Sequence, residues 1–145
     1  MIGKSHRGVL VTLSERKSRF TLLRKVGRKS ADLVAQVVIE LLCWVAHLTT
    51  ITADNGKEFA TQQTISRKLC ADFYYAHPYA SWERGTNGDT NGLIRQYLPK
   101  NRDLIRVTFE EEIMIMDRLN LRPRKYLDFR TPYDVFFGLT VALTT

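Results

Sequence analysis

Short β-branched runs alternate with segments of helical periodicity, and this alternation limits the possible folds more than any other feature. Apolar residues fill positions 9–13 and 20–26, and the polar stretch between them suits a turn, so these runs predict a β-hairpin. Apolar residues recur every three or four positions over 31–48, which predicts a helix with Ser30 as N-cap. Segment 49–53 predicts a buried strand and segment 72–76 another strand, separated by a helix over 57–69.

The remainder of the chain is predicted to be mostly helical. A helix is expected over 87–97, ended by Pro99, and the pair Thr108 and Glu111 forms a capping-box pattern before a helix that runs to about 119. Thr131 and Pro132 have the N-cap and first-turn pattern of another short helix. The order β-β-α-β-α-β-α-α, followed by this short helix, indicates one α/β domain over 1–145, with a mixed β-sheet flanked by helices.

Charge and composition narrow the classes of partner. The net charge of +7 favours a polyanion, most often a nucleic acid. Cys43 and Cys70 are far apart and form no CxxC pair, which argues against a zinc site or a disulfide framework and predicts two reduced core thiols. No signal peptide is visible, and the apolar stretch 33–48 contains Gln36, Glu40 and His47, so we expect a cytoplasmic protein without membrane association, nucleoid-associated if DNA-bound.

The segment 51–59, Ile-Thr-Ala-Asp-Asn-Gly-Lys-Glu-Phe, is the most informative for chemistry. A β-branched strand delivers Asp54 at its carboxyl end, where ligand sites of α/β sheets lie. A carboxylate there can hold a divalent cation. The same residues also suit an Asx-turn, in which Asp54 only caps the next helix. The spacing alone leaves both interpretations open.

Several motifs in order resemble the insertion-sequence-30 family of bacterial transposases. Besides 51–59, they are His77-Pro78-Tyr79, Trp82 to Asn87, Thr90 to Tyr97, Leu121 to Lys125 and Arg130 to Tyr133. Near the start, Ile2-Gly3-Lys4, Leu10 to Leu13 and Glu15 to Arg19 agree as well. The resemblance covers nearly the whole chain.

This resemblance implies a ribonuclease-H-like core of the retroviral-integrase type, in which two Asp and one Glu bind two Mg²⁺ (or Mn²⁺) ions for phosphodiester strand transfer. Two-metal catalysis of this kind stabilises both the attacking and the leaving oxygen. Asp54 matches the second Asp of the family. The family's first Asp lies just upstream of the Ile-Gly-Lys with which this chain starts, so we expect it to be absent, together with most of the central first strand. The position of the family's Glu is held by Gly88, which has no side chain to ligate a metal.

Asp89 is the candidate substitute for the lost glutamate, as a catalytic and metal-binding residue. One helical step rotates a side chain by about 100°, so Asp89 should point away from the original direction. The resemblance therefore implies a catalytically impaired core. The alternative is a non-enzymatic remnant that only binds DNA or pairs with an intact transposase subunit. A third hypothesis is a basic nucleic-acid-binding α/β domain unrelated to transposition.

DNA is the expected partner, through contacts to phosphates that carry little sequence information. The candidate contact residues are Asn55, Lys57, Arg84, Asn91, Arg95 and Lys100. Tyr79 and Trp82 could stack on an unpaired base, although burial against the sheet is the commoner role, and His77 beside Pro78 suits a structural role. Homo-oligomerisation is a further expectation.

Overall fold

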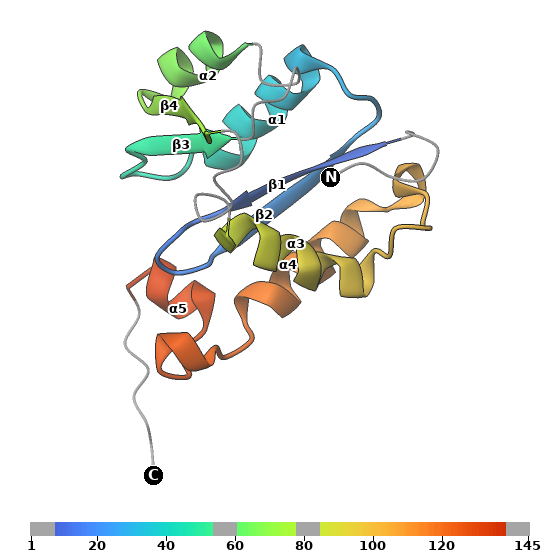
Figure 1. Ribbon diagram of the computed structural model, residues 1–145, viewed down its shortest axis with the longest axis vertical. Helices are drawn as coiled ribbons and strands as arrows, with labels where there is room; N and C mark the ends of the chain where they lie inside the picture. The colour runs from blue at the N-terminus through green and yellow to red at the C-terminus, as the bar shows by residue number, and fades with distance from the viewer. Residues whose placement is uncertain (1–7, 54–60, 78–84, 139–145) are drawn as a thin grey trace.

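The computed structural model of the protein describes residues 8–53, 61–77 and 85–138, with the side chains of the third helix described from Gly88 onward, and the elements follow the predicted order (Figure 1). The strands are β1 (Val9–Ser14), β2 (Thr21–Val26), β3 (Thr50–Ala53) and β4 (Asp72–Tyr75). The helices are α1 (Ala31–Leu42), α2 (Gln62–Leu69), α3 (Gly85–Tyr97), α4 (Phe109–Asn120) and α5 (Pro132–Phe136). Two short 3₁₀ turns, η4 (Leu104–Arg106) and η5 (Lys125–Leu127), complete them.

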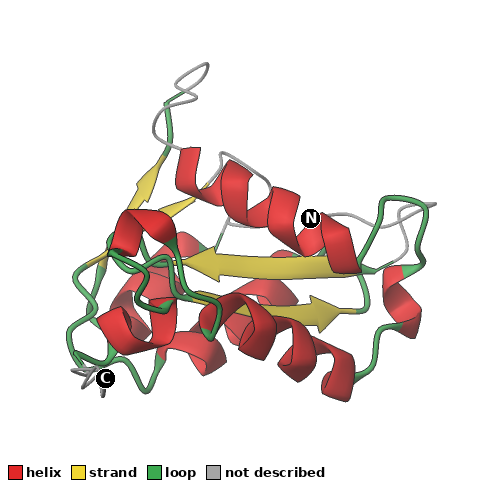
Figure 2. Ribbon diagram, turned by 90° about the horizontal axis from the view of Figure 1, so that it is seen from below, coloured by secondary structure: helices red, strands yellow, loops and turns green. Residues whose placement is uncertain are grey.

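The helices cover both faces of the long hairpin formed by β1 and β2 (Figures 1 and 2). Successive strand residues point to opposite faces. Val9 and Val11 therefore join a core cluster with α1, α2 and Ile51 of β3. Leu10 and Leu23 lie in a second cluster with residues of α3, η4 and α4. The β1–β2 hairpin is thus the central layer that fixes α3 relative to the rest of the fold.

The described strands form two separate pairs rather than one continuous sheet. β1 and β2 are antiparallel, whereas β3 and β4 are parallel, and within 8–53, 61–77 and 85–138 no hydrogen-bonded strand joins the pairs. The core cluster under α1 nevertheless contains residues of β1, β2 and β3, so both pairs pack against the same helix. The shared helix thus holds the two strand pairs together.

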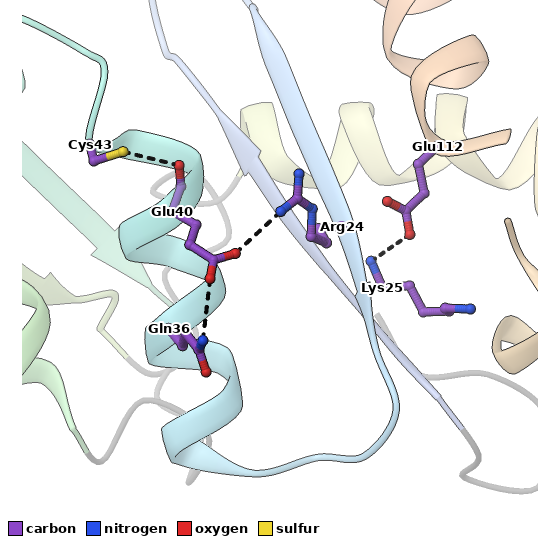
Figure 3. Close-up of polar contacts among 6 residues, drawn as sticks. All are labelled: Arg24, Lys25, Gln36, Glu40, Cys43 and Glu112. Carbon is purple, nitrogen blue, oxygen red and sulfur yellow. Dashed lines mark hydrogen bonds and ion pairs between the residues drawn. The ribbon is translucent and has the colours of Figure 1, made fainter. Parts of the chain in front are cut away.

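The outer edge of β2 is closed by side chains of α4. The backbone N–H of Lys25 donates to a carboxylate oxygen of Glu112 at 3.0 Å (Figure 3), and that of Leu23 to the sulfur of Met116 at 3.4 Å. Asn120 accepts from the N–H of Thr21 and donates to its carbonyl, both at 2.8 Å. The three residues of α4 are spaced four apart, a rise of about 6 Å, and their partners on β2 are spaced two apart, a rise of about 6.6 Å. Each side chain of α4 therefore lies beside one outward N–H of β2. An edge covered in this way cannot pair with a further strand.

The capping patterns are confirmed to different degrees. The side chain of Thr131 accepts from the N–H of Asp134 at 3.0 Å, and the Asp134 carboxylate receives the N–H of Thr131 at 3.4 Å, a complete capping box. Thr108 accepts from the N–H of Glu111, but the Glu111 carboxylate pairs with Arg102 at 2.7 Å. Ser30 is the N-cap residue of α1 but makes no side-chain capping bond.

The predicted helix over 31–48 is too long. α1 ends at Leu42, because Trp44 leaves the helix to stack on Phe137 and to meet Phe20 edge-on, with ring centroids 5.9 Å and 6.3 Å apart. The apolar spacing continues to Leu48, yet packing against rings far away in the sequence determines where the helix ends. The helix predicted over 57–69 begins at Gln62 within the described residues, and positions 57–60 lie outside them.

The prediction of two core thiols is wrong. Cys43 and Cys70 are free and exposed, because each is the residue that caps the carboxyl end of a helix, α1 and α2 respectively. The Cys43 thiol lies 3.3 Å from the carbonyl of Glu40, which is otherwise an unused carbonyl of the last turn (Figure 3).

Of the helices that the structure describes, none has the length and apolar character needed to cross a bilayer.

Gly8 is expected to be intolerant of any side chain. Its φ of +74° is left-handed, and an added Cβ would approach the backbone nitrogen of Ile105 to 3.0 Å and the Cβ of Leu104 to 3.1 Å. Gly8→Ala should therefore lower the free energy of unfolding by about 1–3 kcal/mol, which chemical denaturation can measure. Gly27→Ala is the matched control, since that glycine has open space and no left-handed φ. Equal stability of the two variants would contradict the expected clash and backbone strain at Gly8.

Candidate functional site

The two motif-bearing segments leave the β3–β4 pair at the same edge. β3 and β4 are parallel, Ala53 pairs with Tyr75, and the N–H of Ala76 donates to the carbonyl of Ala53 at 2.9 Å. Asp54 directly follows β3, and the exposed His77 follows β4, so both segments start from the carboxyl ends of neighbouring strands. Asp54, Asn55, Lys57 and Arg84, as well as Tyr79 and Trp82, lie outside the described residues.

The helix that carries position 88 is anchored on the β1 strand. The hydroxyl of buried Thr90 lies 3.2 Å from that of Ser14, and the Thr12 hydroxyl lies 3.2 Å from the side-chain oxygen of Asn91. Ile94 and Leu98 continue the same face into the core. The helix that follows the 78–84 segment is therefore fixed against the hairpin by contacts from Thr90 onward.

Gly88 lies on the exposed side of this anchored helix. A Cβ built at Gly88 would meet no atom of residues 8–53, 61–77 and 85–138 within 4 Å, and its backbone is not left-handed. A side chain is thus tolerated at this position, and the glycine is not required by packing. The geometry leaves room for a carboxylate where the sequence provides none.

Asp89 is exposed, and its charge acts on the hydroxyl of Tyr126. The pKa of this hydroxyl is raised, chiefly by desolvation, and the charges of Arg124 and Arg19 lower it while that of Asp89 raises it further. Among the residues that the structure describes, no three His, Cys, Asp or Glu side chains gather closely enough to hold a metal ion.

The remaining candidates on α3 and just beyond it differ in exposure. Asn91 is half-buried against Thr12 of β1. Arg95 is half-buried and donates to the carbonyl of Leu98 at 3.3 Å, whereas Lys100 is exposed beyond the end of the helix. Lys100 is thus the more accessible of the two cations. A hollow of the described surface, lined by residues that include Asp72 and Gln62, lies at the amino end of β4, opposite the motif-bearing edge.

Sequence reasoning missed a second group of basic and aromatic residues beside α3. It is formed by the hairpin turn 15–19 and the segment 122–130, which meet where the guanidinium of Arg19 lies 5.3 Å from the ring centre of Tyr126. The signal was present in the sequence, because seven of the 22 basic residues fall in these two short stretches. Their proximity could not be inferred, since about a hundred residues separate them.

Comparison with known proteins identifies relatives for most of the chain. A transposase for insertion sequence element IS4351 of Bacteroides fragilis is 47% identical over 137 residues, which are 94% of this chain and 42% of that protein. A transposase for insertion sequence element IS30C of Escherichia coli (strain K12) is 38% identical over 128 residues, 87% of this chain and 33% of that protein. The chain thus spans less than half the length of these relatives. No protein-family model matches it.

The solved structures agree on the fold. The catalytic core domain of BIV integrase superposes with a TM-score of 0.69 at 16% identity, covering 95% of this chain and 90% of that one. At this identity the likeness concerns the fold alone, and it confirms the ribonuclease-H-like architecture. Over most of its length, the chain is related in sequence to part of the transposases of the insertion-sequence-30 family.

Proposed function

We propose that this chain is the catalytic-core domain of a DNA transposase and that the glycine at position 88 impairs its metal site. Its sequence relationship to insertion-sequence transposases over 137 residues supports the lineage. The parallel β3–β4 pair supports the site, because it starts the Asp54 segment and the segment leading to α3 at one edge. The reaction of such a domain is metal-dependent phosphodiester strand transfer during DNA transposition.

A pair of Mg²⁺ or Mn²⁺ ions does not fit the donors of this chain. Two ions about 3.5–4 Å apart need several carboxylates to hold them. Asp54 is the one residue that matches a family ligand, and Gly88 holds the place of the glutamate. Asp89 is a weak substitute, because one helical step turns its side chain by about 100° from the direction of position 88. A weakened site that depends on Asp54 is the most that we expect from these residues.

DNA is the proposed partner, and Asn55, Lys57, Arg84, Asn91, Arg95 and Lys100 are the proposed contacts near the site. Lys100 is exposed and suits a phosphate contact, whereas Asn91 and Arg95 first serve to hold α3 in place. An intact transposase subunit or a second copy of this chain is a further proposed partner. The second candidate function, a non-enzymatic remnant that binds DNA, is favoured by the absent side chain at Gly88.

A plasmid-nicking assay tests the proposal. Supercoiled DNA is incubated with the wild-type chain, Asp54→Asn and Asp89→Asn in Mn²⁺, and its binding to a duplex is measured separately with the metal chelated. We expect duplex binding without metal and only trace nicking, which Asp54→Asn abolishes and Asp89→Asn leaves in place. Efficient nicking that survives Asp54→Asn would rule out the proposed site, and duplex binding with no nicking at all would favour the remnant.

A further inference from the structure

The segment after α4 folds into a closed loop that exposes two aromatic rings. The N–H of Arg124 donates to the carbonyl of Arg130 at 3.0 Å, and the N–H of Phe129 donates back to the carbonyl of Arg124 at 2.9 Å. Asp128 and Phe129 both have left-handed φ angles, of 54° and 63°. Phe129 is consequently 70% exposed and Tyr126 58% exposed. Single exposed rings are common on protein surfaces, but these two lie on one loop together with several basic residues.

The β1–β2 turn is held in shape next to this loop. The Glu15 carboxylate accepts from the N–H of Lys17 at 2.9 Å and from the N–H of Ser18 at 2.6 Å. Desolvation opposes the charge of Glu15, but these bonds and that of the Ser18 hydroxyl prevail and lower its pKa. The Glu15 carboxylate thus makes its hydrogen bonds within the turn, while the side chains of Lys17 and Arg16 are exposed.

Turn and loop join into one basic surface beside α3. Arg19 links them by lying over the ring of Tyr126 at 5.3 Å, and Asp89 near the start of α3 acts electrostatically on the same tyrosine. Residues 15–19 and 122–130 together contain seven Lys and Arg but only Glu15 and Asp128 as acids. Much of the +7 net charge of the chain is therefore concentrated next to the candidate site.

We propose that this surface holds a DNA strand next to position 88, with phosphates on the turn cations and an unpaired base stacked on the loop aromatics. Its members are Arg16, Lys17 and Arg19 of the turn and Lys125, Tyr126 and Phe129 of the loop. Cations beside exposed rings are typical of single-strand binding, because rings stack on any base while Lys and Arg follow the backbone. An acidic protein would use the cations but has no bases to stack. The inference rests on the proposed function and adds where the bound DNA strand lies.

Binding of a labelled single-stranded oligonucleotide, followed by fluorescence anisotropy in EDTA, tests the role of the rings. Phe129→Ala should weaken binding by about fivefold to a hundredfold, the range measured for loss of one base–aromatic stack. Phe109→Ala is the matched control, because Phe109 is 55% exposed and lies 5.7 Å from the Arg24 guanidinium, but on α4. It should bind as the wild type does. Equal effects of the two substitutions, or none, would overturn the proposal.

The salt dependence of the same binding tests the cations. The double variant Lys17→Ala, Lys125→Ala should reduce the slope of log affinity against log salt by about 1.4, since each single-strand phosphate contact contributes about 0.7. The control Arg67→Ala, Lys68→Ala removes two exposed charges of α2 and should leave the slope unchanged. Polyglutamate that competes as well as the oligonucleotide would overturn the proposal. Because no metal is present, failure of the nicking assay leaves these results unaffected.

Discussion

Gly88→Glu is expected to raise the affinity of the chain for Mn²⁺ by at least about tenfold, as titration calorimetry can measure. Loss of a residue that only supports a metal ligand already costs about 10–100-fold in affinity, so a new direct ligand should change it at least as much. No atom in the described part of the chain opposes the substitution, because none lies within 4 Å of a Cβ at Gly88. Gly88 also lies in the first turn of α3, where a negative charge favours the helix.

Two further variants separate ligation from other effects of the new glutamate. Gly88→Gln removes the same flexible glycine and should stabilise the helix similarly, by up to about 1 kcal/mol, without binding metal. Gln96→Glu adds the same charge on an exposed position two turns farther along α3. Neither should raise the affinity for Mn²⁺. A gain shared by Gln96→Glu would mean that the added charge alone attracts the cation, and position 88 would lose its special role.

Asn120→Ala should lower the free energy of unfolding by about 2–4 kcal/mol, the largest change in stability that we expect from a single polar residue. Asn120 is 5% exposed and satisfies both the N–H and the carbonyl of Thr21, which is itself buried. Each buried polar group left without a partner costs about 1–3 kcal/mol. For a domain of this size the melting temperature should fall by about 10 °C.

The same substitution should also expose the edge of β2. Its outward N–H groups are covered by Glu112, Met116 and Asn120, and an uncovered strand edge can pair with another chain. Light scattering during refolding should therefore increase for Asn120→Ala. Asn101→Ala, at an exposed turn position, is the control and should stay within about 0.5 kcal/mol of the wild type. A melting temperature of Asn120→Ala equal to that of the control would contradict the edge-capping role.

Local patterns in the sequence were sufficient to predict the order of strands and helices. Alternating residues such as Val9 and Leu10 could be assigned to opposite faces, and the Thr131–Asp134 cap could be recognised, because both depend on neighbours within a few positions. The end of α1 could not be predicted, because it depends on the contact of Trp44 with Phe137. The buried faces of Glu112 and Asn120 were equally hidden, since polar residues in an amphipathic helix normally face solvent.

The candidate site was predictable only in part, for the same reason. The strand–Asp pattern before position 54 and the glycine at position 88 could be read directly from the sequence. The contact between Arg19 and Tyr126 could not, because the two residues lie far apart in the sequence.

Paramagnetic broadening by Mn²⁺ in the Gly88→Glu variant can show whether the end of β3 and position 88 of α3 form one metal site. Amide signals are recorded across the chain while Mn²⁺ is added below one equivalent. We expect the signals of Ala53 and of residues 88–91 to disappear together, because Asp54 and the new glutamate hold the same ion. Broadening around the acidic start of α4, Glu110–Glu112, with Ala53 unaffected, would contradict this shared site.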